Sequence, residues 1–232
     1  MTVLSAVQAA STWIGVAVPT VLFTGTDRTS VELQAMVNEC AKAIAEDFDW
    51  SRLRTLATIT GDATTTDWSL PSDYSRMLKK ASLWPSAMPT TPIQHIADTD
   101  EWLMLDVQGF QSVVQRWTIY GNQIHVKPAI ASAATAKYYY ISNLLVSATG
   151  STTLTKTDFT LDTDSLFVDE RLLKLNLIWR WKAAKGRPYA EDLANYQNAL
   201  DVVAGADRGS RFISIGRSRS GDVNIAFPWA VT

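Results

Sequence analysis

The segment "FTLDTDSLFVDERLLKLNLIWRWKAAKGRPYAEDLANYQNAL", residues 159–200, decides the fold because it predicts two consecutive helices. Five acids and no base occupy residues 157–170, and six bases and no acid follow in residues 171–188. Acids before a helix and bases toward its end complement the helix dipole. Gly186 marks the end of this first helix, and Pro188 opens a second one that runs to about Ala204 and stops at Gly205. The segment is therefore predicted to form a helical hairpin.

A further long helix is expected near the N-terminus. Thr29-Ser30-Val31-Glu32 has the pattern of a capping box, and the helix should run to about Asp47. After this capping box, apolar side chains recur at steps of three and four residues. This spacing predicts one buried stripe along the helix: Leu33, Met36, Val37, Cys40, Ile44 and Phe48. Residues 1–54 and 160–209 together are predicted to form a helical bundle.

Between these two segments the pattern is typical of antiparallel strands, so residues 55–159 are expected to form an inserted β-rich domain. Gly121-Asn122 lies between two alternating runs, which indicates a tight hairpin. Residues 64–70 alternate as a short edge strand, which Pro71 ends because proline has no N–H to donate to a sheet. Ser72-Asp73 should then form a turn. The predicted fold class is α+β, with an extended C-terminal arm over residues 210–232.

Composition excludes several classes of protein. The 232 residues are 47% hydrophobic, enough for a core without disulfides or metals, and the net charge of −2 argues against a protein that mainly grips nucleic acid phosphates. The single cysteine, Cys40, falls on the apolar stripe and is expected to be a buried, unreactive thiol. The apolar run at residues 13–23 is too short to span a bilayer and has no preceding Lys or Arg, so neither a signal peptide nor a membrane helix is expected.

Residues that could perform catalysis or bind metal do not form a recognisable set. His95 and His125 have no Cys, His or carboxylate at metal-ligand spacing, and Asp162-Thr163-Asp164 lacks the Gly and the distant Glu of a calcium loop. We therefore expect no enzyme activity, cofactor or metal. Lys174, Lys182 and Lys185 share roughly one helix face, which leaves open a weak contact with DNA or with another subunit.

The order of the elements resembles the head-to-tail adaptor, or neck, proteins of tailed bacteriophages. The resemblance extends from about Thr29 to Arg211 and follows "EDFDWSRL", "DWSLPSDYSRM", "SLWP", "TDEWL", "IHVKP", "YYYISN" and the segment quoted first. Its most specific parts are "LPSDY" and "LIWRWKAAKGRPYAEDLANY". The resemblance implies a structural protein of the virion neck, made in the bacterial host cytoplasm. Such adaptors form dodecameric rings beneath the portal protein, meet a stopper or tail protein below, and surround the passing double-stranded DNA.

Two groups of contact residues follow. The resemblance implies that a C-terminal arm reaches the portal, and its arginines and aromatic residues are the candidate contacts: Arg211, Phe212, Arg217, Arg219, Phe227 and Trp229. Trp50 and Trp68 are interpreted as packing where the bundle meets the β domain, with Pro71 fixing the direction of the chain at that joint.

Two other functions remain open at this point. The chain could be a carbohydrate- or protein-binding module of a phage tail or fibre, with Trp102, Trp117 and Tyr139 exposed to stack on a ligand. It could also be a hydrolase that uses two carboxylates such as Asp73 and Asp106, although nothing in their spacing requires this.

Overall fold

The computed structural model describes residues 2–78, 81–107 and 115–208. These residues fall into two compact units. The described part of the helical unit lies within Met1–Arg54 and Ile141–Arg211, and that of the β unit lies within Thr55–Tyr140. Residues 141–159, which the sequence places in the β-rich domain, thus cluster with the helices. The domain boundaries stay a prediction.

The first two helices begin with side-chain caps. Helix α1 spans Val3–Ile14, capped by Thr2, and ends at Gly15, whose φ of 74° is left-handed. Helix α2 spans Arg28–Asp47, and the Asp27 carboxylate accepts a hydrogen bond from the Ser30 backbone N–H. The predicted end at Asp47 is confirmed, whereas the capping box expected at residues 29–32 is wrong because Asp27 caps the helix two residues earlier.

The C-terminal hairpin consists of α4, Glu170–Ala184, and α5, Ala190–Arg208. Asp169 caps α4 by accepting from the Arg171 backbone N–H, and Gly186 follows its end with a positive φ of 65°. Helix α5 continues past Gly205, so the stop predicted there is wrong. Tertiary contacts explain the extension, since Asp207 accepts hydrogen bonds from the backbone N–H and the hydroxyl of Ser51.

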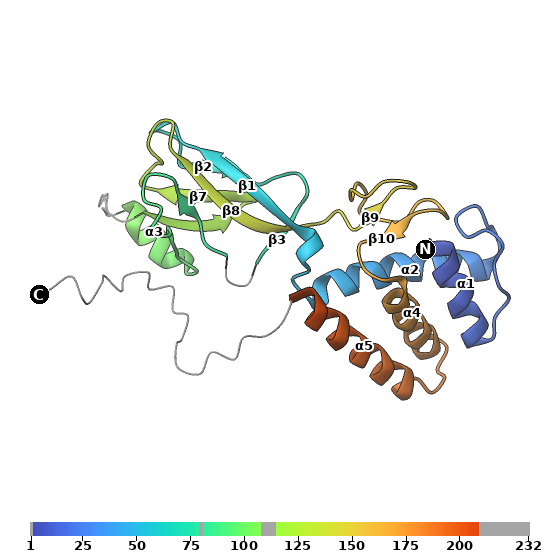
Figure 1. Ribbon diagram of the computed structural model, residues 1–232. Coiled ribbons are helices and arrows are strands. Elements are labelled where there is room, and N and C mark those ends of the chain that lie inside the picture. Colours follow the sequence, from blue (N-terminus) through green and yellow to red (C-terminus); the bar gives the residue numbers. More distant parts are fainter. Residues whose placement is uncertain (1, 79–80, 108–114, 209–232) are drawn as a thin grey trace, which may run out of the picture. The chain divides into compact units, whose positions relative to one another are not determined.

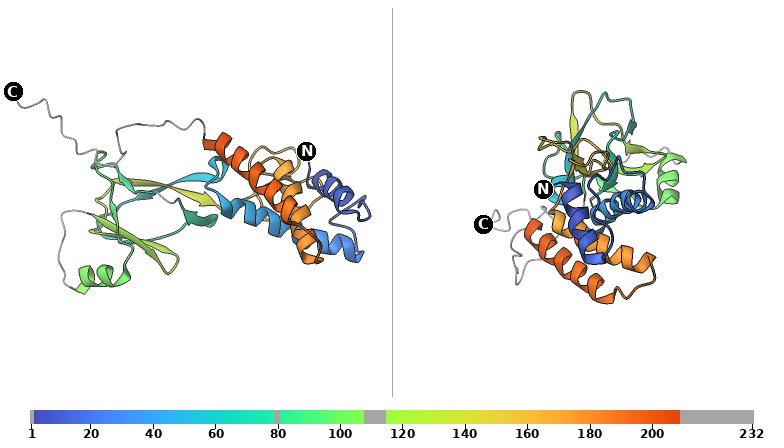
Figure 2. Two further views of the ribbon diagram at one scale, coloured as in Figure 1. Left: turned by 90° about the horizontal axis from the view of Figure 1, so that it is seen from below. Right: turned by 90° about the vertical axis from the view of Figure 1, so that its right-hand side faces the viewer.

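Helix α4 is central to the helical unit, because it contacts α1, α2 and α5 (Figure 1, Figure 2). A short 3-10 turn, η1 at Ser51–Leu53, follows α2, and the strand pair β9 (Val146–Ser147) and β10 (Ser165–Leu166) precedes α4. The core of the helical unit includes residues of α2, η1 and α4 and of the segments that connect the elements: Leu33, Val37, Ile44, Trp50, Leu53, Phe159, Phe167, Leu172, Leu173 and Leu177.

The β unit contains two small sheets and one helix. In one sheet the order is β2-β7-β6-β5; in the other it is β1-β8-β3, with β4 also paired to β8. The bounds are β1 Arg54–Thr60, β2 Asp67–Ser69, β3 Tyr74–Met77, β4 Trp84–Pro85, β5 Gln94–His95, α3 Thr99–Val107, β6 Arg116–Tyr120, β7 Gln123–Lys127 and β8 Thr135–Ser142. The core between them includes Ile59, Leu83, Ile93, Trp117, Ile124, Val126, Ile130, Tyr138 and Tyr140.

Two local predictions for the β unit are confirmed. Strands β6 and β7 form an antiparallel hairpin whose turn residues, Gly121 and Asn122, both have a positive φ, as a type I′ turn requires. Strand β2 is a short edge strand that ends before Pro71, and Tyr74 N–H donates to the Pro71 carbonyl across the predicted turn. The strand is shorter than predicted because Asp62 binds the backbone N–H groups of Thr64 and Thr65 and holds them in a turn.

The mixture of a helical unit and β-sheets confirms the predicted α+β class. One described pair differs from the antiparallel pattern that the sequence predicts, because β5 pairs with β6 in parallel. None of the described helices is both long and apolar enough to cross a lipid bilayer. The predicted C-terminal arm lies outside the described residues.

Candidate functional site

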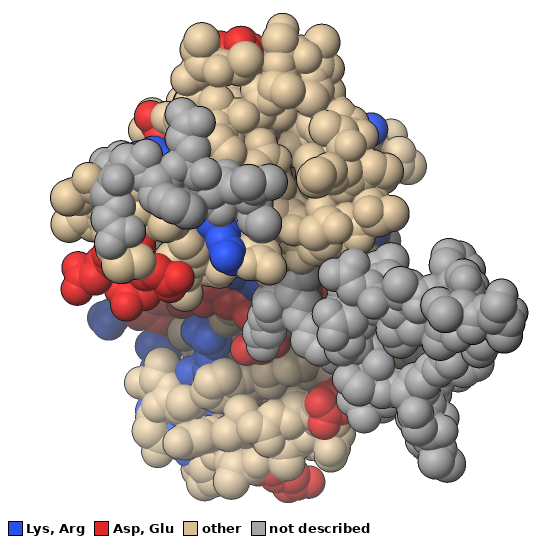
Figure 3. All heavy atoms as spheres, turned by 90° about the vertical axis from the view of Figure 1, so that its left-hand side faces the viewer, with Lys and Arg blue, Asp and Glu red and all other residues tan. Residues whose placement is uncertain are grey.

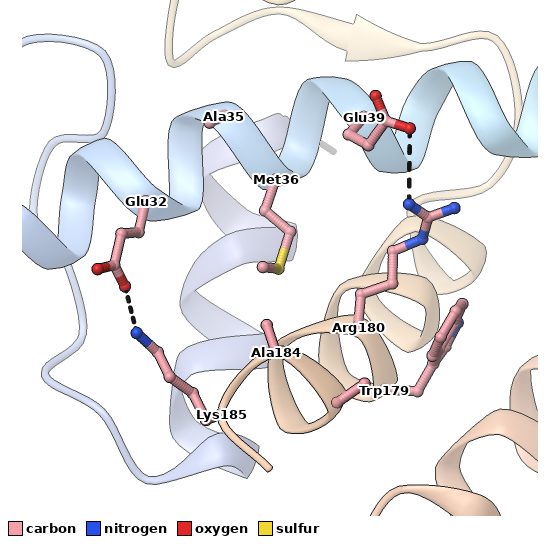
Figure 4. A pocket seen from close by; sticks show the side chains of 9 residues that line it. Glu32, Ala35, Met36, Glu39, Trp179, Arg180, Ala184 and Lys185 are labelled. Atoms are coloured by element: carbon pink, nitrogen blue, oxygen red, sulfur yellow. Dashed lines mark hydrogen bonds and ion pairs between the residues drawn. The ribbon is translucent and has the colours of Figure 1, made fainter. Parts of the chain in front are cut away.

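An apolar groove on the helical unit lies between α2 and α4 (Figure 4). Its volume is about 710 Å³. Small and apolar residues form its wall: Ala35 and Met36 from α2, and Trp179, Ala183 and Ala184 from α4. The groove exists because alanines stand where larger residues would fill the space between the two helices. It can therefore accept an apolar side chain from a partner.

Charged pairs border this groove on two sides (Figure 4). Glu32 of α2 is 2.6 Å from the Lys185 ammonium, and Glu39 is 3.7 Å from the Arg180 guanidinium. Hydrogen bonds from Lys185 and then from Arg28 lower the pKa of Glu32, so this carboxylate is ionised at neutral pH. Its charge is already neutralised by two cations of the same chain. This arrangement suits a structural groove better than an acid–base site.

A second concave surface, which we call the α4/α5 cleft, lies on the helical unit and has a volume of about 390 Å³. Trp13 of α1 stands at this cleft and is 70% exposed, with the Lys174 ammonium 5.2 Å from its ring centre. The remaining lining residues are Arg171, Leu175 and Ile178 of α4, and Asp192, Asn195, Asn198, Ala199 and Val202 of α5. The cleft thus combines an exposed aromatic ring, an apolar floor and two cations.

The three lysines proposed to touch DNA or another subunit all have partners within the chain. Lys174 lies over Trp13, Lys182 pairs with Asp192 at 2.5 Å, and Lys185 pairs with Glu32. Intramolecular pairing reduces the attraction that Lys182 and Lys185 can exert on phosphates. Their role in a lumen stays a prediction.

The residues assigned to the joint lie in different units. Trp50 is buried in the helical unit, where its indole N–H donates to the Ile44 carbonyl at 2.7 Å and its ring meets Phe167 edge-on at 5.8 Å. Trp68 belongs to β2 and packs against the core of the β unit. Each tryptophan thus has a structural role in its own unit, and the joint stays a prediction.

The six residues proposed as portal contacts lie outside the described residues. Arg211, Phe212, Arg217, Arg219, Phe227 and Trp229 follow Arg208, where α5 ends. The docking arm therefore stays a prediction.

Two side chains that could take part in a reaction, His125 and Cys40, are held in structural surroundings instead. His125 is buried against Asp67 and stacks on Tyr120 at 3.7 Å between ring centres. Burial raises the pKa of the Cys40 thiol to about 12, which makes it unreactive, as predicted. Within residues 2–78, 81–107 and 115–208 no group of three or more His, Cys, Asp or Glu side chains could hold a metal ion.

The aspartates that resemble part of a calcium loop stabilise the helical unit instead. Asp162 accepts hydrogen bonds from the backbone N–H groups of Leu22 and Phe23, and Asp164 accepts from Thr160, Leu161 and the Lys156 ammonium. The backbone carbonyls of Asp164 and Asp162 accept from Val3 and Leu4, so they satisfy the first N–H groups of α1.

The residues of the two alternative functions are placed as follows. Trp102 and Trp117, expected on the surface of a ligand-binding module, are 5% and 3% exposed, and of that set Tyr139 alone is exposed. The expectation that these two tryptophans stack on a ligand is wrong, because both fill the interior. Of the proposed acid pair, Asp73 accepts a hydrogen bond from the Tyr140 hydroxyl, and the Asp106 side chain is outside the described structure.

The outer face of α3 is a feature that the sequence patterns did not predict. Asp100, Leu103, Met104 and Val107 follow the spacing i, i+3, i+4 and i+7, and all four side chains are exposed, while Trp102 points inward and is buried. This spacing was visible in "TDEWLMLDV" and could have identified the face, but not whether it is turned to solvent.

Comparison with known proteins gives one result at the level of families. The model of the SU10 adaptor protein family matches residues 1–219, a range that includes the described parts of both units. No curated protein sequence matches the chain.

Proposed function

This chain belongs to the SU10 adaptor protein family of phage adaptors, and from this membership we propose that its copies form a ring beneath the portal that joins the head to the tail. The observation that carries the proposal is the extent of the family match, residues 1–219. An adaptor must contact several partners at once, and the helical unit offers two concave surfaces suited to such contacts, the α2/α4 groove and the α4/α5 cleft.

In the proposed ring the chain has three kinds of protein partner: the portal protein above, a stopper or tail protein below, and further copies of itself. The proposed ring is a dodecamer and holds twelve copies in all. The C-terminal arm, residues 210–232, would bind the portal, with its three arginines, Arg211, Arg217 and Arg219, meeting acids there. The neck of the virion is the proposed location.

Passage of DNA through the ring is part of the same proposal. A conduit that binds phosphates strongly would slow the DNA, because each contact must be broken as the duplex moves. The net charge of −2 supports a weakly interacting channel, as does the pairing of Lys182 with Asp192 and Lys185 with Glu32. We propose a structural role rather than an enzymatic one.

The decisive experiment is a cryo-EM reconstruction of the neck of the parent phage particle. We expect a ring of this chain directly below the portal, with residues after Arg208 directed to the portal. Absence of the chain from the neck, or its presence in a tail fibre, would reject the proposal and favour a recognition module. Labelling the C-terminus with a small tag provides the control, because it identifies the chain independently of the fit of the map.

A further inference from the structure

We propose that the outer face of α3 in one copy binds the α4/α5 cleft of the next copy, so that two different surfaces of the chain meet wherever neighbouring copies touch. The inference rests on the proposed ring, and it names the two surfaces that meet in it. It concerns a contact between copies of the chain.

The outer face of α3 has the form of a docking helix. Leu103, Met104 and Val107 are 56%, 47% and 78% exposed, and the spacing from Asp100 places them on one side of the helix. Trp102 on the other side anchors α3 to the β unit, where the Lys127 ammonium lies 5.5 Å from its ring centre. A fixed helix that shows three large apolar side chains to water is typical of a protein–protein contact.

The α4/α5 cleft presents a matching surface. Arg171, Lys174, Leu175 and Ile178 on α4 have the spacing i, i+3, i+4 and i+7, and so do Asn195, Asn198, Ala199 and Val202 on α5. Two such rows on adjacent helices form a groove, and a third helix can pack the side chains of one of its faces into it. Trp13 and Val202, 70% and 71% exposed, supply apolar area at the cleft that a docked helix would cover.

The charge of the α4/α5 cleft favours a helix that carries acidic side chains. Arg171 and Lys174 have no carboxylate partner within the described part of the chain, whereas Asp192 is neutralised by Lys182. The cleft therefore carries an excess of positive charge. The first turn of α3 holds Asp100 and Glu101, which form no ion pair with any described residue.

The start of α3 carries three exposed acids, Asp98, Asp100 and Glu101. In the view of Figure 3 the Asp and Glu side chains, drawn red, form separate groups, one of them at the left. An acidic, apolar helix and a cationic, apolar cleft are complementary in both charge and polarity. The α2/α4 groove is a poorer match for α3, because the charges at its border are already paired within the chain.

The symmetry of such a contact leads to a ring. The two surfaces are different patches of the same chain, so each copy can offer α3 to one neighbour and its cleft to another. A contact between unlike patches extends from copy to copy and closes into a ring when the rotation between copies allows it. A contact between like patches would stop at a dimer.

The first test uses cysteine cross-linking in the adaptor–portal complex, isolated through a tag on the portal, and in the concentrated free chain. Leu103→Cys and Val202→Cys are combined in one chain and treated with a short bismaleimide. The natural Cys40 is buried and gives no background. We expect a series of covalent products longer than a dimer from the double variant and none from either single variant. Leu103→Cys with Val31→Cys is the matched control, because Val31 is 51% exposed but lies outside the cleft.

The outcomes separate the inference from the proposed function. If the chain binds the portal but the double variant gives no product, the inference is wrong and the ring proposal stands. A link within one copy, or between the cleft and the portal, would also overturn it. If the chain does not bind the portal but the free chain still gives the series, the contact is supported and the portal role fails. No product in either preparation overturns the inference.

Charge exchange provides a second, independent test. Arg171→Glu with Lys174→Glu, or Asp100→Lys with Glu101→Lys, should each weaken association between copies about tenfold or more, because like charges then face each other. The four changes together in one chain should restore association. Circular dichroism controls for folding, and Asp98, whose carboxylate binds the Asp100 N–H, is left unchanged. Failure of the combined variant to recover, with the fold intact, would overturn the pairing.

Discussion

Asp164 is expected to be the most important charged residue for the stability of the helical unit. Its side chain is fully buried, and it accepts hydrogen bonds from the Thr160 and Leu161 N–H groups at 3.0 Å and from the Lys156 ammonium at 2.9 Å. Asp164→Ala leaves two backbone donors and an ammonium group without their buried acceptor. Removing one partner of a buried pair costs about 3–5 kcal/mol, and because Lys156 keeps 26% exposure we expect about 3 kcal/mol.

Urea denaturation of the full chain, followed by tryptophan fluorescence, measures this loss in the transition of the helical unit. Asp62→Ala is the matched control, because Asp62 also accepts from two backbone N–H groups, those of Thr64 and Thr65, but is exposed to water. Water can replace the lost acceptor there, so the control should lose only a small fraction of the free energy lost by Asp164→Ala. A loss below about 1 kcal/mol for Asp164→Ala would refute the reasoning.

The pH dependence follows from the same contacts. Burial alone would raise the pKa of Asp164, but the hydrogen bonds from Thr160, Lys156 and Leu161 outweigh it and lower the pKa below its ordinary value. A carboxyl with a lowered pKa in the folded state contributes stability above its unfolded pKa and loses it as the pH falls through the folded pKa. The difference in stability between the natural chain and Asp164→Ala should therefore be full at neutral pH and shrink below about pH 4. A difference that does not change between pH 7 and pH 3 would contradict the assignment.

Three further predictions concern the β unit, the joint and the arm. Asn122→Val should destabilise the hairpin by about 1–2 kcal/mol, because a β-branched residue tolerates its φ of 61° poorly; urea denaturation measures this, and an unchanged midpoint would contradict the turn assignment. Pro71→Ala should alter the orientation of the units, measured by small-angle scattering, more than the melting temperature; a lower melting temperature with unchanged assembly would show that the joint role is wrong. Deletion of residues 212–232 should leave the circular dichroism spectrum of a folded chain but prevent heads from joining tails in a complementation assay, and a truncated chain that still joins them would exclude the arm as the anchor.

The sequence predicted those elements whose local signals agree with their tertiary contacts. The type I′ hairpin at Gly121-Asn122 is one case, because both residues tolerate a positive φ and the flanking strands alternate. Helix α2 is another, since four residues of its predicted stripe are buried: Leu33, Val37, Cys40 and Ile44. The other two are only half-buried, because Met36 lines the α2/α4 groove and Phe48 follows the end of the helix. Where local signals compete, the prediction failed. Asp27 and Thr29 can both cap a helix, and only the structure shows that Asp27 does so.

The end of α5 and the strand before Trp68 show how contacts distant in sequence decide between local alternatives. Gly205 costs an isolated helix about 1 kcal/mol, and the bonds of Asp207 to Ser51, a residue far away in the chain, offset this cost. In residues 61–77 the threonines favour a strand, but Asp62 binds two of their N–H groups and prevents it. Neither competition can be resolved by propensity or periodicity alone.

The candidate surfaces could be predicted only in part, and the reason lies in α4. Its inward residues Leu172, Leu173 and Leu177 fill the core, while the rows at either side of them line two different surfaces, the α2/α4 groove and the α4/α5 cleft. In the sequence these rows overlap within residues 171–188 and appear as a single basic helix, so the sequence predicts one face for all three lysines. The structure separates them: Lys185 borders the groove and Lys174 the cleft. One helix can thus hold the core together and still contact different partners on each side, because its periodicity gives each row its own direction.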